Sequence, residues 1–354
     1  MSSRSEECAS PTWSDDQLDS PIPPEITPPY FDDQLGAWVL SRHADVLAAF
    51  RSPGLVPTGA KSRPDKPAPD EIARLKLRAE TKTALSLRHL QQWQRDLMPK
   101  VCALTQSLPT SQTVDLVGEF ARPLCLILAT AVTRADPHDA QRLEKLAKHV
   151  SDAAAEPFDA KTGALAEEAK AQLHGCFHAG PEPLRASGFV ALSHTLPCLL
   201  ANAWLALLHH PQQWKRLHHH PVLIPKAVEE LLRYAGLTRL LFRRAIEDVD
   251  LTSVRVRRGE RVILRIAAAN KDPERFPYPE QIDWTHQGKG HLALGAGPHS
   301  CVGANLIRMA AITITRPLLE RFAQAEISGA IEWHGGPVFR APVSLPVCLR
   351  ETIA

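Results

Sequence analysis

The stretch that decides the fold lies late in the chain, where residues 290–303 read GHLALGAGPHSCVG and lead into an apolar, helix-forming segment. Gly295, Gly297 and Gly303 let the backbone turn tightly and approach a flat ligand, because glycine has no Cβ and tolerates positive φ. We expect Cys301 near a helix N-terminus, where the dipole and free N–H groups lower a thiol pKa. Such a thiolate suits a haem iron as an axial ligand. A buried structural cysteine after a turn is an equal alternative on this loop alone.

A second motif lies upstream, in the segment AVEELLRY at residues 227–234. Its helical pattern puts Glu230 and Arg233 three apart on one face. Alone, such a pair is a common surface salt bridge that contributes little. Together with the cysteine loop, the segment resembles the cytochrome P450 superfamily, which pairs a Glu-x-x-Arg helix with a Phe-x-x-Gly-x-x-x-Cys-x-Gly haem loop.

Further segments resemble the bacterial soluble branch of that family, namely residues 202–211, 224–234, 243–248 and 270–277. The resemblance is strong from about residue 191 to the C-terminus and weaker before it. One departure lies inside the key loop, where Leu294 replaces the family's phenylalanine and would shield the thiolate differently.

The resemblance implies a mainly α fold with a small β lobe, the cytochrome P450 fold. We expect one haem domain over residues 29–354, preceded by a Ser-, Pro- and Asp-rich segment, 1–28, that is disordered or loosely draped. The family usually runs longer, so trimmed loops are expected. The short linker at 176–183 predicts a deletion above the distal pocket, which would widen access or leave room for a partner.

Composition narrows the class of protein. The 354 residues carry 41 Lys and Arg against 39 Asp and Glu, a net charge of +2, which gives no bias toward nucleic acid or a membrane surface. The sequence has no run of 18 apolar residues, so no membrane span is expected. No signal peptide is expected either. The seven cysteines show no metal-type pairing, so a reduced, cytoplasmic setting is expected.

Periodicity and turn signals predict the elements between these motifs. Helices are expected over 44–50, 70–87 with Asp70 as N-cap, 89–107, 113–133, 185–209, and twice within 137–178. Strands are expected over 36–40 and 238–242, and a hairpin over 256–264 turning at Gly259.

By resemblance, the chain binds haem b, with Cys301 as the iron ligand within the loop that contains Gly295 and Gly303. Arg243 and His299 stand where the family binds haem propionates, and guanidinium–carboxylate contacts are strong. In helix 70–87 the family's histidine is absent. Lys76 and Arg78 compete for the family's arginine role, and solvated helix charge is an equal alternative.

The expected distal helix carries the family's oxygen-handling segment at residues 191–195. Thr195 stands where the family's threonine handles dioxygen and its protons. His194 replaces the acid that relays protons, and histidine can do so near neutral pH; alternatively, it points away. Leu192 replaces a glycine that makes room for oxygen, and Pro197 should kink the helix.

The same resemblance implies the walls of the substrate pocket and a brace behind the haem. The pocket residues are Ala191, Thr238, Arg239 and Leu240, with Arg239 a candidate contact for an anionic substrate or else an outward-facing charge. Glu230 and Arg233 are expected to be structural and to brace the segment behind the haem rather than do chemistry. The arginine that completes their set in the family is missing here.

The function implied is monooxygenation of a small organic molecule by a thiolate haem, with electrons from an external ferredoxin-type donor. Arg308 and helix 70–87 are the expected docking charges for that donor. A peroxide-using or oxygen-independent, isomerase- or dehydratase-like enzyme is an alternative, and a non-catalytic haem-binding protein is another. No nucleic-acid or membrane partner is expected.

Overall fold

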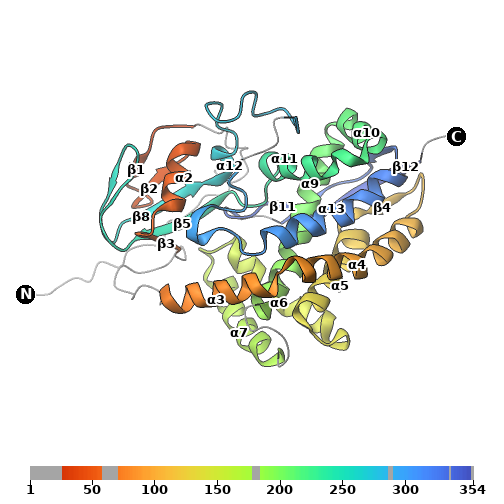
Figure 1. Ribbon diagram of the computed structural model, residues 1–354, viewed down its shortest axis with the longest axis horizontal. Coiled ribbons are helices and arrows are strands. Elements are labelled where there is room, and N and C mark those ends of the chain that lie inside the picture. Colours follow the sequence, from red (N-terminus) through yellow and green to blue (C-terminus); the bar gives the residue numbers. More distant parts are fainter. Residues whose placement is uncertain (1–25, 58–70, 178–183, 286–289, 335, 352–354) are drawn as a thin grey trace, which may run out of the picture.

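The computed structural model describes residues 26–57, 71–177, 184–285, 290–334 and 336–351. The expected N-terminal segment 1–28 and the Asp70 cap therefore lie almost entirely outside the described residues. A small β lobe with α2 occupies one end of the molecule and the helices fill the rest (Figure 1). The mainly α fold with a small β lobe is confirmed.

The β lobe is a five-stranded sheet in the order β1-β2-β8-β5-β3. Strand β2 runs parallel to β8, and the other neighbours are antiparallel. Its own apolar core gathers around Phe50 and Leu264, against α2 and the short α12. The bounds are β1 Tyr30–Asp32, β2 Ala37–Leu40, β3 Leu55–Pro57, β5 Leu240–Ala245, β8 Arg261–Arg265, α2 His43–Arg51 and α12 Ile266–Ala269.

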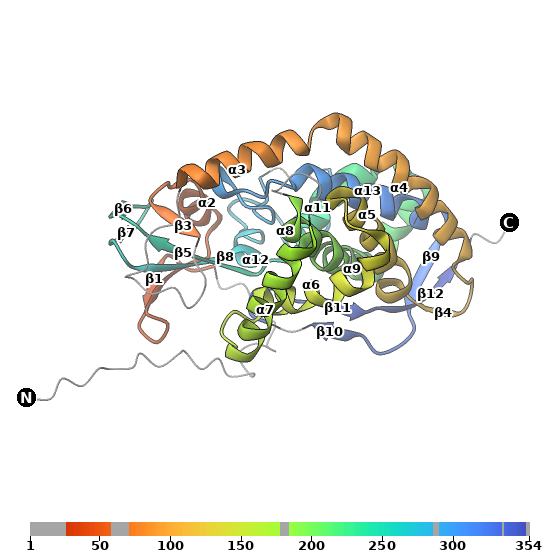
Figure 2. The same cartoon turned by 90° about the horizontal axis from the view of Figure 1, so that it is seen from below.

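The larger lobe packs its helices around a second core that contains the fully buried Trp204, Trp214 and Trp284. Helices α3 and α4 run end to end along one side, and α6 packs beside α7 (Figure 2). The bounds are α3 Glu71–Ala84, α4 Leu87–Ser107, η1 Leu116–Ala121, α5 Arg122–Thr133, η2 Pro137–Asp139, α6 Ala140–Ala155, α7 Ala160–Cys176, α10 Pro211–His219, η5 Pro221–Leu223, α11 Ile224–Tyr234, η6 Gly297–His299 and α13 Ala304–Arg321.

The expected long helix over 185–209 exists but is divided. It comprises α8 Ala186–Val190, the π-helical turn η4 Ala191–Thr195 and α9 Leu196–Leu208. Pro197 has no N–H to donate to the preceding turn. The N–H of Leu196 bonds the carbonyl of Ala191, five residues back, so the break takes the form of a wide turn. The kink predicted from Pro197 is thus a π turn at the candidate distal site.

Three small sheets complete the fold: β4 Thr113–Asp115 with β12 Pro346–Arg350 and β9 Gln324–Ile327; β10 Glu332–His334 with β11 Ala341–Ser344; and β6 Val249–Asp250 with β7 Arg255–Val256. The helix expected over 113–133 is wrong at its start, because β4 pairs with β12. The hairpin over 256–264 is also wrong. Gly259 does turn, at φ +90, but β7 pairs with β6 and β8 pairs with β2 and β5.

Two continuous helical stretches, Leu116–Thr133 and Ala186–Leu208, are long and apolar enough to cross a membrane by composition, although 56% of the most apolar window in each is buried in the fold. Core helices of soluble proteins meet the same test. The expectation of no membrane span stays a prediction.

Helix α11 contains a buried ion pair whose two side chains also form hydrogen bonds to the segment before the cysteine loop. Arg233 Nη2 lies 2.6 Å from Glu230 Oε1, and neither side chain is more than 4% exposed. Where the family has a third arginine, Arg233 instead donates to the carbonyls of Asn270, Pro279 and Gln281. The N–H of Asp283 donates to Glu230. Backbone carbonyls and one N–H group therefore take the place of the missing arginine beside Glu230 and Arg233.

Replacing Arg233 by methionine should lower the free energy of unfolding by about 3–5 kcal/mol, because it leaves the Glu230 carboxylate buried and unpaired. Urea denaturation of the haem-loaded protein, followed by circular dichroism, measures this. The matched control is Lys271→Met, which removes a more exposed ion pair with Glu280 and should cost about 1 kcal/mol or less. Equal losses in the two variants would contradict the bracing role.

Candidate active site

The cysteine loop is a tight turn packed against α2. The N–H of Cys301 donates to the Leu294 carbonyl over 2.7 Å, and Gly295 and Gly297 both have φ +67. A Cβ on Gly297 would lie 2.4 Å from the carbonyl oxygen of Phe50. Glycine is therefore required there both for the backbone angle and for the close approach.

The Cys301 thiol is a neutral group in this setting. Burial raises its pKa, and the Gly303 N–H, Arg78 and Arg308 oppose that rise only in part. The sequence expectation of a lowered pKa is wrong, because α13 begins at Ala304 and burial outweighs the dipole. A thiolate at this position therefore needs a bound cation, such as iron, to offset the cost of burial.

A carboxylate that sequence reasoning missed holds the loop to the neighbouring helices. Glu229 accepts from Arg308 Nε at 2.6 Å and Nη2 at 3.0 Å, and His291 Nε2 lies 3.5 Å from it. Burial would raise the pKa of Glu229, but His291 and Arg308 lower it to about 2. Its contribution to stability is therefore present above its ordinary pKa and is lost only as the pH falls toward 2.

Two more contacts fix the start of the loop. Asn270 Oδ1 accepts from the Leu292 N–H at 2.6 Å, and the His43 ring lies 2.7 Å from the Gly290 carbonyl. The only signal for Glu229 in the sequence is its place beside Glu230, and neither Asn270 nor His43 gave any.

The basic residues expected to surround the cofactor behave differently from one another. Arg78 donates to the Ser300 carbonyl at 2.6 Å and to its hydroxyl at 2.8 Å, so its guanidinium reaches the residue next to Cys301. Lys76, on the same helix, is exposed. Arg243 is 4% exposed and lies over the Phe50 ring at 5.4 Å. His299 is half-buried in η6.

Phe50 links Arg243 to the loop. A Cβ on Gly295 would lie 3.7 Å from that ring, and Gly297 packs on the Phe50 carbonyl. The structure thus brings Arg78, Arg243, His299 and Cys301 to one neighbourhood and leaves Lys76 outside it.

The π turn of the distal helix has two distinct faces. Ala191 is exposed and Thr195 is half-buried, whereas Ser193 and Leu196 are buried. Leu192 is 3% exposed and belongs to the helical core. The exposed face therefore offers Ala191 and Thr195 to a ligand.

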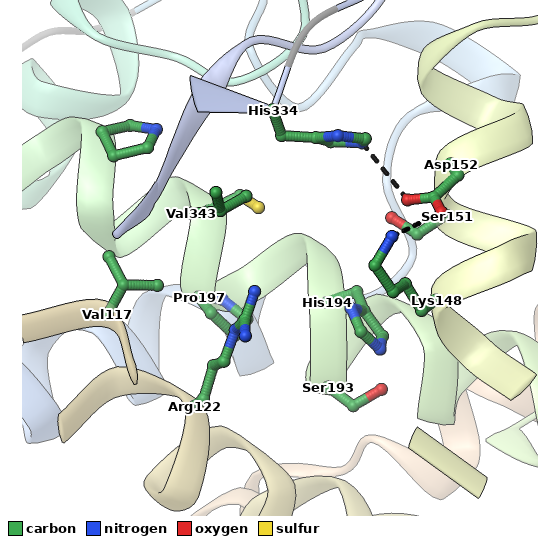
Figure 3. Close-up of a pocket in the computed structure, with 12 residues that line it drawn as sticks. Val117, Arg122, Lys148, Ser151, Asp152, Ser193, His194, Pro197, His334 and Val343 are labelled. Atoms are coloured by element: carbon green, nitrogen blue, oxygen red, sulfur yellow. Dashed lines mark hydrogen bonds and ion pairs between the residues drawn. The ribbon is translucent and has the colours of Figure 1, made fainter. Parts of the chain in front are cut away.

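His194 lies on another side of the turn, toward α6. Its Nε2–H donates to the Glu144 carbonyl at 2.8 Å, and burial lowers its pKa. The ring is neutral near pH 7, and its Nδ1 is left as the acceptor. Figure 3 shows it in the wall of a cavity with Ser193, Lys148 and Asp152.

The expected pocket wall continues from the end of α11. Thr238 forms an isolated antiparallel bridge with Phe339, and the Arg239 N–H donates to the Val338 carbonyl. Thr238, Arg239 and Leu240 are all half-buried. Burial, with Arg340 and Arg265 nearby, lowers the pKa of Arg239.

This donor set fits a haem held by one thiolate. Among the described residues, no group of three or more His, Cys, Asp and Glu is arranged to hold a metal ion. A Cβ on Gly303 would sit 3.9 Å from the Cys301 Sγ, in contact with the sulfur, so glycine keeps that side clear. Arg78 and Arg243 supply positive charge at the rim, as two carboxylate side chains of a haem require.

Comparisons with known proteins agree with this geometry. The cytochrome P450 family model matches residues 206–329. The chain is 28% identical to cytochrome P450 CYP107DY1 of Priestia megaterium, over 89% of this chain and 91% of that one. It is also 28% identical to the mycinamicin IV hydroxylase/epoxidase of Micromonospora griseorubida, over 91% of each.

A solved structure of P450BioI, in complex with an acyl carrier protein ligated to hexadec-9Z-enoic acid, superposes with a TM-score of 0.81 at 24% identity, over 91% of this chain and 95% of that chain. The sequence motifs, the loop geometry and these relatives together support the cytochrome P450 superfamily, whose members are haem-thiolate monooxygenases, as the family that this chain resembles.

Proposed function

We propose that the protein binds haem b through Cys301 and hydroxylates a small organic substrate with dioxygen and electrons from a separate ferredoxin-type protein. The observation that carries this proposal is the half-buried Cys301 thiol beside the Gly303 N–H, in a loop fixed by Glu229 and Asn270. We also propose that residues 29–354 form a single haem domain. The proposed setting is the cytoplasm, in keeping with the free cysteines of the described residues.

A thiolate-ligated haem supplies the oxidising chemistry, since the thiolate pushes electron density toward the iron and favours O–O cleavage. The chain's residues hold and tune that group. The Gly303 N–H points at the Cys301 sulfur and, with Arg78 nearby, stabilises its charge. Arg243 and His299 bind the haem carboxylates, and Arg78 takes the family's arginine role in preference to Lys76.

On the distal side, Thr195 orients a water or hydroxyl proton toward the exposed face that it shares with Ala191. His194 is turned toward Glu144, so a proton reaches Thr195 from water rather than directly from this ring. That orientation also favours a second candidate function, in which peroxide replaces dioxygen and electrons, because hydrogen peroxide already carries the two protons that dioxygen must take up from outside.

The electron donor docks on the side of the cysteine loop. Arg308 is not a free docking charge, because Glu229 holds it in a two-point ion pair; the expectation for Arg308 is corrected to that extent. Exposed Lys76 and Lys82 of α3 are the better docking charges for an acidic donor.

The substrate carries an anionic group that pairs with Arg239. Within the described residues this half-buried guanidinium has neither an ion pair nor a side-chain hydrogen bond, and its charged neighbours are Arg340 and Arg265. A carboxylate on the ligand would satisfy it. The P450BioI structure holds a fatty acid on its carrier protein, which is one precedent for an acyl substrate in this fold.

Cys301→Ser should abolish the red-shifted Soret band of the reduced carbon monoxide complex, because a hydroxyl does not replace a thiolate as iron ligand. Optical spectra and haem content measure this. Cys348→Ser, in β12, is the matched control and should leave the spectrum unchanged. An unaltered spectrum in Cys301→Ser would exclude Cys301 as the ligand.

Thr195→Ala should lower product formed per electron consumed by about ten-fold or more, because a positioned proton donor contributes at least that much. Electron-donor consumption and product are measured together. Thr130→Ala, whose hydroxyl bonds the Leu126 carbonyl within α5, is the control. Unchanged coupling, with product made from peroxide alone, would favour the second candidate function.

Arg239→Gln should weaken binding of a saturated fatty acid by about ten-fold or more, since a charge-assisted hydrogen bond is lost, while binding of its methyl ester should stay the same. The haem spin shift on titration reports both ligands. Arg257→Gln, on an exposed turn of the β lobe, is the control. If acid and ester are equally affected, Arg239 does not select an anionic substrate.

A further inference from the structure

A small cavity lies behind the π turn, away from the face that carries Ala191 and Thr195. Its volume is about 40 Å³. The walls come from η4 and the start of α9, from α6, from the first residue of α5 and from strands β10 and β11 (Figure 3). A water needs roughly 10–15 Å³ on this measure, so the space suits a group of about three heavy atoms and not a whole organic substrate.

One carboxylate in the wall is already neutralised. Asp152 forms an ion pair with Lys148 at 2.7 Å, and His334 Nε2 lies 3.5 Å from its other oxygen. The dashed contacts in Figure 3 mark this chain of three groups along one edge of the cavity. Asp152 is therefore held away from Arg122.

Arg122 is different. Its side chain extends from the first turn of α5 into the space between Pro197 and His194 (Figure 3). Over the part of the chain that the structure describes, no ion pair or side-chain hydrogen bond joins it. Glu144 is near enough for Arg122 to oppose the rise that burial causes in the Glu144 pKa, but the two form no ion pair.

The remaining titratable groups in the wall add no negative charge at neutral pH. Burial lowers the pKa of His194, whose Nε2–H is already committed to Glu144. Burial raises the pKa of Cys198 to about 11, so it stays a thiol. Lys148 and Asp152 form an ion pair, so among the described residues Arg122 is the cation in the wall that has no ion pair of its own, with the Glu144 carboxylate within its electrostatic reach.

An oxyanion is the natural complement of this arrangement. A half-buried guanidinium has lost part of its hydration and gains most from two parallel hydrogen bonds to a planar acceptor. We propose that the cavity binds a small planar oxyanion of the carboxylate class, gripped by Arg122, with Lys148 and His334 at its edge. His194 lines this cavity, whereas Ala191 and Thr195 of the same turn do not.

Isothermal titration of the haem-loaded protein with sodium acetate, at ionic strength fixed with chloride, tests the proposal. Saturable binding at one site is expected. Arg122→Gln should weaken it by ten-fold or more, and Arg122→Lys should weaken it less, because one charge remains without the two-point grip. Lys148→Gln should produce a smaller loss. Equal affinity in Arg122→Gln and the parent protein, or no saturable binding, would overturn the site.

Matched controls lie on the same helix. Arg142→Gln and Lys145→Gln remove exposed cations of α6 that do not line the cavity, and both should leave acetate affinity unchanged. Sulfate should bind more weakly than acetate, and equal binding would contradict a planar site. Octanoate distinguishes two sources of the carboxylate. If octanoate binds as tightly as acetate, the carboxylate can belong to a longer molecule whose tail lies in solvent; if octanoate binds more weakly, the ligand is a free small anion.

Discussion

Two adjacent glutamates on α11 hold the cysteine side of the molecule together. Neighbouring helix residues point about 100° apart, so Glu229 reaches the loop and α13 while Glu230 turns inward to Arg233. The first pair is partly exposed and the second is buried. Through them one helix fixes both the loop that carries Cys301 and the segment 270–283 that precedes it. Without that brace, a buried thiol in a glycine turn has no fixed position to offer a metal.

Much of this was accessible from the sequence, because the motifs carry their own geometry. The glycine loop with Cys301 and the pair Glu230–Arg233 are local patterns, and amphipathic helices such as α4 and α6 follow from periodicity. Strand pairing was less accessible. Segment 261–265 pairs with β2 and β5, which are far apart in the sequence. No residue near Gly259 indicates that β8 pairs with these two strands rather than with β7.

Candidate members of the site could be named from the sequence, but Glu229, Asn270 and His43 were missed and the electrostatics could not be predicted. Proximity to a helix N-terminus suggested a lowered pKa for Cys301, yet burial, which depends on tertiary packing, dominates. Similarly, the letters of 191–195 do not say which face of a π turn each residue takes. The turn itself follows from Pro197, and it leaves Ala191 exposed and Thr195 half-buried, while His194 forms a hydrogen bond to α6.

Two half-buried arginines have no ion pair among the described residues. Arg239 lies among arginines, and Arg122 lines a cavity in which Asp152 already pairs with Lys148. A protein of net charge +2 has enough carboxylates to pair both, yet the described residues place none against either. Leaving a partly buried guanidinium without an acid costs stability, unless a ligand supplies the acid. The two arginines thus point to anions of different size, since the space around Arg122 admits only a small group, whereas Arg239 lies in the wall of the expected substrate pocket.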